Sequence, residues 1–220
     1  MTLASGKDEV GLALTMRVFL LAILGGHRQA ALNIVMAAHK EGYTVPDIYL
    51  QVFQEALYEI GRLWESNRIS VAAEHRGTAI TQYVIAHLYQ NMIPNDVRRG
   101  AMVITGIKGE LHQVGAHMVA DMFEADGWDV RFLGANVPPE GVVAAVREHN
   151  ADVVGISTTM MFNIPQVVEL VESVRREFGA AAPRILLGGS AFRAAPTLPD
   201  ELNGCDVALT IQEALALTRK

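Results

Sequence analysis

The sequence lacks the features that mark disulfide-rich, membrane-spanning and nucleic-acid-binding proteins. Its single cysteine, Cys205, excludes an intrachain disulfide and a zinc site built from cysteines. The apolar run 16–25 is too short to span a bilayer, and the charged residues 7–9 that precede it are unlike a signal peptide. The net charge of −6 and the absence of a dense Lys/Arg cluster argue against direct nucleic-acid binding. We therefore expect a soluble cytoplasmic protein.

The first half of the chain has the pattern of a helical bundle. With 220 residues, half of them hydrophobic, the chain is long enough for one large or two modest domains. Breaks at 25–26, 42–46 and 66–67 separate the helical periodicities, and Thr44 or Pro46 stands near the third helix start. Short connections between amphipathic helices imply an antiparallel four-helix bundle, placed in a cap domain of residues 1–94. The expected helices are 8–24, 28–41, 46–65 and 69–91.

The second half alternates apolar runs with helical periodicities, which predicts an α/β domain over residues 99–220. Five strands at this spacing favour a flavodoxin-like (Rossmann-type) parallel sheet in the order 2-1-3-4-5, with right-handed crossovers. The polar segment 93–100 is the expected linker. The expected strands are 101–106, 129–133, 152–157, 184–188 and 206–209. The expected helices are 113–126, 139–149, 164–178, 192–196 and 211–219.

The loop that follows the first expected strand carries the most chemical information. It places His112 at the carboxyl edge of the sheet, where α/β folds bind ligands. A neutral imidazole is a good ligand for a transition metal, and Glu110 is placed to accept the other ring N–H and fix the tautomer. Gly115, at the start of the next helix, lets a bulky group approach the backbone. The alternatives are a surface histidine and a solvated loop carboxylate.

Two further strand ends carry small residues. Ser157 ends the third expected strand, and Gly188 and Gly189 end the fourth. Ser157 is either a helix N-cap or turn residue, or a hydroxyl that meets a bound ligand. The two glycines are either ordinary turn residues or a slot without side chains.

These marks resemble those of cobalamin-binding domains. Glu110-x-His112-x-x-Gly115 is similar to the family signature Asp-x-His-x-x-Gly, and the serine and the glycine pair follow in order. The resemblance implies that His112 replaces the cofactor's own nucleotide base as lower axial ligand of cobalt. It also implies that Glu110 and Leu111 belong to the same cofactor loop.

The resemblance extends to the pocket for the nucleotide tail. It implies that Ser157 meets the displaced base or the ligand network, and that Gly188 and Gly189 leave a slot for the tail. The sequence departs from the family at two positions. Glu110 replaces the commoner aspartate, and Thr159 replaces the leucine of Ser-x-Leu in the pocket wall.

The helical half contains a second constellation. Trp64 ends one expected helix, and Glu74 and His75 lie early in the next. Without context, these are a core tryptophan and two solvated residues. Trp, nine residues, then Glu-His resembles the cap motif of cobalamin-dependent photoreceptors of the light-responsive transcription-regulator type. That resemblance implies that the three residues cover the upper face of the cofactor.

The chain departs from those photoreceptors in two ways. Glu65 stands where the best-known members have a histidine that captures cobalt after illumination. A helix-turn-helix module, which usually precedes the bundle in that family, is missing from this sequence.

From the resemblance we expect a cobalamin light sensor, with adenosylcobalamin or another alkyl- or hydroxocobalamin. Its output would be a change in cap packing, read by a transcription regulator or by self-association. The sequence has no catalytic constellation, so we do not expect an enzyme. The main alternative is a corrinoid carrier that shuttles methyl groups between methyltransferases. A cobalamin storage module is third, and a flavin or nucleotide binder is last, because the first loop lacks a phosphate-cradling glycine run.

Overall fold

The computed structural model describes residues 6–92, 96–195 and 197–219. The chain splits into two compact units, Met1–Met92 and Ile93–Lys220, here called the helical unit and the sheet unit. Residues 93–95 of the expected linker lie outside the described residues. Within the described ranges, no helix combines the length and the apolar character that a membrane span requires.

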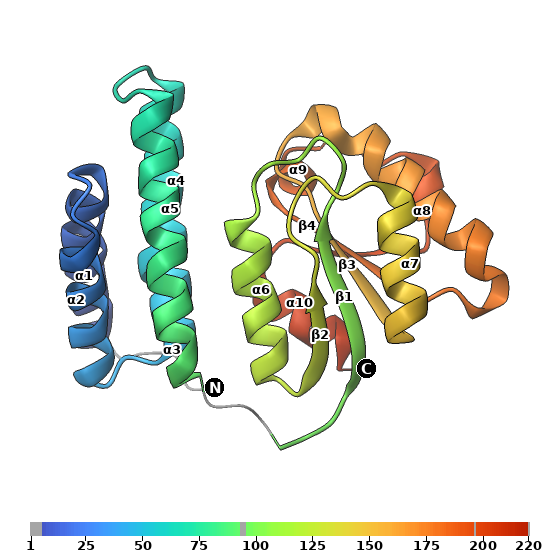
Figure 1. Ribbon diagram of the computed structural model, residues 1–220, viewed down its shortest axis with the longest axis horizontal. Coiled ribbons are helices and arrows are strands. Elements are labelled where there is room, and N and C mark those ends of the chain that lie inside the picture. Colours follow the sequence, from blue (N-terminus) through green and yellow to red (C-terminus); the bar gives the residue numbers. More distant parts are fainter. Residues whose placement is uncertain (1–5, 93–95, 196, 220) are drawn as a thin grey trace. The chain divides into compact units, whose positions relative to one another are not determined.

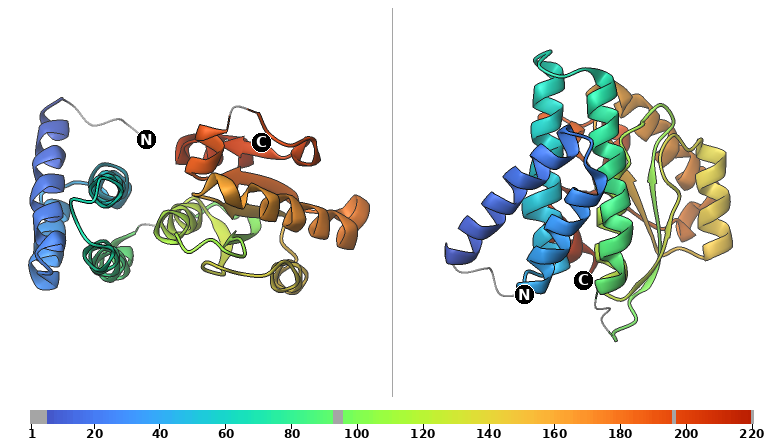
Figure 2. Two further views of the ribbon diagram at one scale, coloured as in Figure 1. Left: turned by 90° about the horizontal axis from the view of Figure 1, so that it is seen from above. Right: turned by 60° about the vertical axis from the view of Figure 1, so that its left-hand side comes forward.

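The helical unit contains the four long helices that the sequence predicts, packed side by side (Figures 1 and 2). Thr44 begins the third with a capping box, because its hydroxyl accepts from N of Asp47 at 3.2 Å and the Asp47 carboxylate accepts from N of Thr44 at 3.3 Å. The helices are α1 (Gly6–Leu24), α2 (Arg28–Lys40), α3 (Val45–Ile48) running on into α4 (Gln54–Glu65), and α5 (Val71–Leu88).

One expected helix differs from its prediction. The segment 46–65 is not a uniform α-helix, because Tyr49–Phe53 forms a π-helical turn between α3 and α4. The wider turn accompanies three fully buried rings: Phe53 lies 5.6 Å from Tyr49 and 5.1 Å from Phe19, between ring centroids. Ring packing of this kind is a tertiary effect, which helical periodicity does not record.

The sheet unit is a five-stranded parallel sheet in the order β2-β1-β3-β4-β5, as predicted (Figure 1). Its central strands are apolar along their length because helices cover both faces. Helices α7 and α8 pack on one face, and α6 and α10 lie on the other. The strands are β1 (Gly100–Gly106), β2 (Trp128–Phe132), β3 (Val153–Ser157), β4 (Arg184–Gly188) and β5 (Asp206–Ala208). The helices are α6 (Val114–Ala125), α7 (Pro139–His149), α8 (Ile164–Phe178), α9 (Ser190–Ala194) and α10 (Ile211–Thr218).

The short helix after β4 begins earlier than the predicted range 192–196, whose last residue lies outside the described part. Gly189 has a φ of +106°, which turns the chain directly out of β4 and starts α9 at Ser190. The backbone N–H of Ala191 then donates to the carbonyl of Thr158 at 3.2 Å. This bond ties the start of α9 to the loop that follows β3.

A buried carboxylate joins the two ends of the sheet unit. Asp126, at the C-terminus of α6, forms ion pairs with Arg99, which precedes β1, and with Arg219, which follows α10. The Nε atom of Arg99 lies 2.7 Å from Oδ2 of Asp126. The backbone N–H of Arg99 donates to the carbonyl of Gly127 at 3.0 Å. Two guanidinium groups therefore share one carboxylate at the end of the sheet opposite the carboxyl edge.

Candidate functional site

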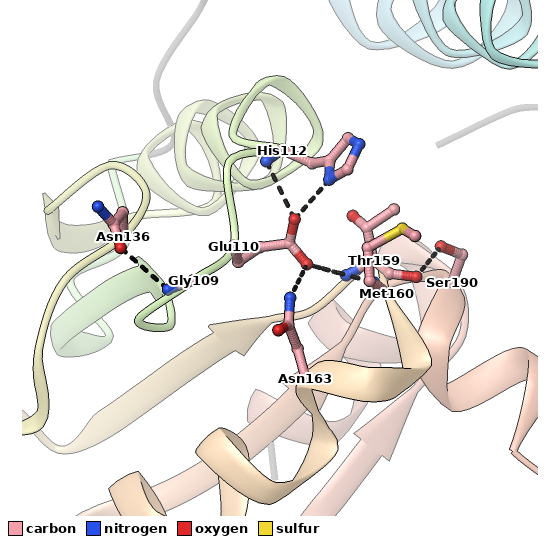
Figure 3. A network of polar contacts seen from close by, with 8 residues as sticks. All are labelled: Gly109, Glu110, His112, Asn136, Thr159, Met160, Asn163 and Ser190. Atoms are coloured by element: carbon pink, nitrogen blue, oxygen red, sulfur yellow. Dashed lines mark hydrogen bonds and ion pairs between the residues drawn. The ribbon is translucent and has the colours of Figure 1, made fainter. Parts of the chain in front are cut away.

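The loop between β1 and α6 turns the side chain of Glu110 into the sheet unit. Gly109 precedes it with a φ of +83°, and its N–H donates to Oδ1 of Asn136 at 2.9 Å (Figure 3). A parallel bridge between Ile107 and Val137 lies just beyond β1. Although the loop lies at the edge of the sheet, Glu110 is only 1 % exposed.

Both carboxylate oxygens of Glu110 accept hydrogen bonds (Figure 3). Its Oε2 accepts from N of Thr159 at 2.8 Å, from N of Met160 at 3.2 Å and from Nδ2 of Asn163 at 3.4 Å. Its Oε1 accepts from N of His112 at 3.1 Å and from Nδ1 of the same residue. Glu110 therefore joins the loop after β1 to the loop after β3.

These bonds keep the buried carboxylate ionised. Burial by itself raises the pKa of Glu110, but hydrogen bonds from the His112 side chain and from the Thr159 and His112 backbones outweigh it, together with the charge of His112. The net effect lowers the pKa from 4.5 to about 2. An ionised carboxylate only accepts hydrogen bonds, so it takes the imidazole N–H rather than donating to the ring.

The contact with Glu110 sets the chemistry of His112. With the proton on Nδ1, the lone pair is on Nε2, at the far side of the ring from the carboxylate. The His112 side chain is 55 % exposed, in contrast to its buried partner. The described residues contain no group of three or more His, Cys, Asp or Glu side chains that could hold a metal. A single histidine of this kind suits a metal that already carries a macrocycle.

The surroundings of His112 fit such a macrocycle. Leu111, Met161 and Phe162 are exposed apolar side chains in the two loops that Glu110 joins. A Cβ added at Gly115 would meet no atom within 4 Å, so the start of α6 is open to a close approach. An exposed imidazole beside apolar side chains and an open backbone matches the needs of a large, partly apolar cobalt complex.

The predicted serine and one of the glycines lie level across the carboxyl edge. Ser157 pairs in register with Gly106 of β1 on one side and with Gly188 of β4 on the other. Gly188 in turn pairs with Ala208 of β5. A Cβ added at Gly188 would lie 3.5 Å from the carbonyl oxygen of Ala208 and would meet nothing closer. Four small residues therefore form one row along this edge.

Gly189 and Thr159 have structural contacts of their own. A Cβ added at Gly189 would overlap the backbone of Thr158, at 2.8 Å from its carbonyl carbon and 2.9 Å from its nitrogen. Thr159 uses its N–H on Glu110, and its carbonyl accepts from Oγ of Ser190 at 3.0 Å (Figure 3). The backbones of both residues thus support the loop that holds the carboxylate.

The three candidates of the helical unit lie at the turn between α4 and α5. Trp64 is 43 % exposed near the end of α4, so its indole is not a core residue. Glu74 contacts Nδ1 of His75 and accepts from Oγ1 of Thr78 at 2.8 Å, on the surface of α5. The structure gives no contact between Trp64 and this Glu–His pair among the hydrogen bonds, ion pairs and ring contacts of the described residues.

Sequence reasoning missed Asn163, whose amide donates to Glu110, and it missed the bond from the backbone N–H of Met160 to the same carboxylate. Asn163 is the N-cap residue of α8, yet its side chain does not cap the helix. Asparagine before Ile164-Pro165 has the sequence signature of a helix start. That signal places the residue but does not indicate that its amide reaches a carboxylate 53 positions earlier.

Comparisons with known proteins agree on the cofactor. A family model described as a B12 binding domain matches residues 100–218, and a second with the same description matches residues 16–89. A corrinoid protein from Desulfitobacterium hafniense (strain Y51) is 24% identical over 206 residues, which are 90% of this chain and 93% of that protein. Dimethylamine corrinoid protein 1 of Methanosarcina acetivorans is 25% identical over 123 residues, 56% of this chain and 57% of that protein.

The fold has a solved counterpart. The monomethylamine corrinoid protein of Methanosarcina barkeri matches with a TM-score of 0.79 at 18% identity, covering 90% of this chain and 94% of that chain. The prediction of an α/β fold with a helical N-terminal unit is confirmed, and so is cobalamin binding. The prediction that the chain is not an enzyme is also confirmed, because the relatives matched over most of their length are corrinoid proteins.

The prediction of a light sensor is wrong. Corrinoid proteins, some named for methylamines, match the chain, and closeness to photoreceptors is not what these comparisons show. The prediction that a transcription regulator or a second copy of the chain is the signalling partner is wrong for the same reason. The Trp64…Glu74-His75 spacing does not distinguish a sensor from a carrier, and neither does the two-unit layout, which both classes have.

Proposed function

Since the chain belongs to the B12 binding domain family, we propose that it is a corrinoid carrier that moves a methyl group between two methyltransferases. When bound, the corrinoid supplies a cobalt centre that accepts and releases the methyl group. The partners we propose are therefore methyltransferases, and the expected location is the cytoplasm. The corrinoid relative that covers 90% of this chain supports a corrinoid protein over a flavin or nucleotide binder. Relatives named dimethylamine corrinoid proteins support a methyl carrier over a cobalamin storage module.

The observation that supports the cofactor part of this proposal is the Glu110–His112 pair, whereas the carrier role is supported by the similarity to corrinoid proteins. Glu110 is buried and holds the proton at Nδ1, so His112 presents Nε2 as the proposed lower ligand of cobalt. The bonds from Thr159, Met160 and Asn163 fix the carboxylate before any cofactor arrives. Ordering this ligand on binding therefore costs little free energy.

The remaining candidates take supporting roles in the proposal. At the lower face, Leu111 and Gly115 would contact the macrocycle, and residues at the carboxyl ends of the strands would receive the nucleotide tail.

For the upper face, we propose that Trp64, Glu74 and His75 of the helical unit contribute to covering the methyl position. The exposure of the Trp64 indole supports this role, because an exposed aromatic side chain is available to a ligand. The residues that would receive the nucleotide tail at the lower face are Ser157, Thr159, Gly188 and Gly189.

Electron paramagnetic resonance tests the proposed ligand. Protein loaded with cobalamin and reduced to the paramagnetic cobalt(II) form should show a triplet splitting from one axial nitrogen. Growth with 15N-labelled histidine should convert this triplet to a doublet, because the nitrogen then comes from the protein. A triplet that persists in labelled protein would show that the cofactor keeps its own base and would exclude His112 as the ligand. His117→Ala is the matched control, since His117 stacks on Phe132 with ring centroids 5.2 Å apart and has no proposed ligand role.

A transfer experiment tests the carrier role itself. The loaded protein is reduced to cobalt(I), methylated with radiolabelled methyl iodide with loss of iodide, desalted and mixed with a purified methyltransferase that takes methyl groups from corrinoid proteins, together with the methyl acceptor of that enzyme. A carrier should give up the label while the corrinoid absorbance stays with the chain through several cycles. Corrinoid that leaves the chain together with the label would instead indicate a storage or delivery module.

A further inference from the structure

Helix α1 carries apolar side chains on two opposite sides. Its inner side packs into the helical unit through Leu12, Phe19 and Ile23, all fully buried. Its outer side has four exposed apolar side chains at spacings of four, four and three residues, which place them on one face of the helix. No other helix of the described residues exposes more than two large apolar side chains. The four, here called the outer stripe, are Val10 (72 % exposed), Leu14 (61 %), Val18 (38 %) and Leu21 (68 %).

The segment that carries the outer stripe has no negative charge along its length. Residues 10–40 contain no Asp or Glu, although the whole chain has 24 of them and a net charge of −6. The same segment contains Arg17, Arg28 and Lys40, all exposed. Arg17 lies on the same face of α1 as the outer stripe, and it has no ion pair among the described side chains. The outer stripe is therefore an apolar surface whose charge is positive only.

The composition of the outer stripe favours a different protein as the molecule that covers it. A lipid-binding helix has one strongly polar face, whereas α1 is apolar on both sides and is held in the bundle by its inner side. A basic lipid site also needs a cluster of roughly four to eight cations, and Arg17 is the one cation on this face of α1. Two copies of the chain would bring two positive surfaces together, which opposes self-pairing. An apolar row around an arginine is typical of a protein–protein interface.

We propose that the outer stripe is the docking surface for a partner methyltransferase, whose contacting surface is apolar and places carboxylates opposite Arg17. This inference rests on the proposed function, since a carrier needs such a partner and a storage module does not. Helix α1 lies at the margin of the helical unit, beside α2 and α5 (Figure 2). Docking there occupies none of the candidate cofactor residues. Charge attraction at Arg17 speeds encounter more than it prolongs binding, which suits a carrier that must also leave.

The test measures methyl transfer at increasing concentrations of the carrier. Carrier with a labelled methyl group is mixed with the purified methyltransferase of the transfer experiment, and rates are expressed per loaded cobalt. In Leu14→Gln/Leu21→Gln the KM for the carrier should rise about 10-fold or more while kcat stays as in the parent, because docking is lost and the chemistry is not. Glutamine is a good helix former, so α1 should remain folded.

Arg17→Glu tests the charge of the docking surface. The KM of the parent should rise as NaCl increases from about 0.05 to 0.3 M, since salt screens the attraction. Arg17→Glu should have a higher KM than the parent at low salt, and added salt should lower it. Tyr58→Gln is the matched control, because Tyr58 is also an exposed residue of the helical unit, 42 % exposed on α4. Its KM should stay within about twofold of the parent.

An unchanged KM in the double variant, an equal rise in Tyr58→Gln, or a loss in kcat alone would overturn the inference. A clearly lower melting temperature of the ligand-less double variant would do the same, by showing that another part of the chain covers the outer stripe. Light scattering and cosedimentation with vesicles of phosphatidylglycerol and phosphatidylcholine test the other occupants. A dimer, or vesicle binding, that the double variant abolishes would assign the outer stripe to a second copy or to a membrane. A parent that transfers no label at any concentration would instead fail the proposed function, and this inference with it.

Discussion

A glutamate contacts a neighbouring histidine in each of the two units, and these two pairs differ in burial. In the sheet unit, Glu110 is buried and accepts from three further groups besides His112. In the helical unit, the Glu74 side chain is 22 % exposed and His75 is 75 % exposed. The residue types and the contacting ring nitrogen are the same in the two pairs.

The difference shows what makes such a pair useful to a metal. Glu74 is partly open to water and accepts from one other side chain, that of Thr78, so it holds its exposed histidine less firmly than Glu110 does. A buried carboxylate held by backbone N–H groups has one position, and it therefore gives the imidazole one orientation. Burial of the acid, rather than the sequence pair itself, distinguishes the two sites.

Replacing each histidine by alanine is the strongest way to break this comparison. His112→Ala should lose nitrogen ligation and weaken corrinoid binding by more than the roughly 10- to 100-fold typical of a supporting residue. His75→Ala should keep the parent spectrum and bind within about twofold. Absorption titration with hydroxocobalamin measures both. Equal losses in the two variants would mean that the buried pair has no special role.

Replacing each glutamate tests the energetic part of the comparison. Glu110→Ala removes the acceptor of Thr159, Met160 and Asn163, so the free energy of unfolding should fall by about 2–4 kcal/mol. Glu74→Ala should cost less, about 1 kcal/mol or below, because Glu74 is only partly buried and its histidine partner is exposed. Urea denaturation without ligand measures both values. A similar cost at the two positions would contradict the burial argument.

Two glycines of the sheet unit allow a structural role to be compared with a role in cofactor binding. Gly189→Ala should destabilise the ligand-less protein by about 1–3 kcal/mol, because a positive φ and an overlap with Thr158 both oppose a side chain. Gly115→Ala should leave the stability unchanged or raise it by up to about 1 kcal/mol, since alanine favours helix and meets no atom. Its effect should instead fall on corrinoid affinity. Thermal melts and corrinoid titrations together separate the two roles.

The smallest effect is expected at Trp64. Its indole is about half-exposed, so Trp64→Ala should lower the free energy of unfolding by about 1–2 kcal/mol, less than for a core tryptophan. If Trp64 covers the upper face, the variant should also discriminate less between methylcobalamin and adenosylcobalamin. A variant with the parent's ligand preference would leave the helical unit without a demonstrated contact to the cofactor.

Much of the fold was predictable from the periodicity of apolar residues, whereas the hydrogen bonds that hold Glu110 in the site were not. Strand order and the position of His112 follow from apolar runs and from the spacing of Glu110, His112 and Gly115. The bonds of Glu110 to Met160 and Asn163 join residues 50 and 53 positions apart, which no local pattern encodes. Likewise the π turn at Tyr49–Phe53 depends on rings from another helix.

The function was harder to predict than the site. The residues of the lower face are shared by carriers and sensors, so they identify the cofactor but not its use. The light-sensor prediction depended on the spacing of Trp64, Glu74 and His75, which a hairpin of two α-helices with a surface tryptophan can also produce. Whole-chain similarity to corrinoid proteins was the information that the residues alone did not contain.

The shared carboxylate of Asp126 has a consequence for engineering the sheet unit. Because Arg99 and Arg219 both reach it, residues 99 and 219 lie within the span of two side chains. A unit with adjacent termini can be inserted into a loop of another protein, or circularly permuted, with little strain on the host. Joining residues 99 and 219 by a short flexible linker and opening the chain elsewhere should therefore give a folded, permuted module.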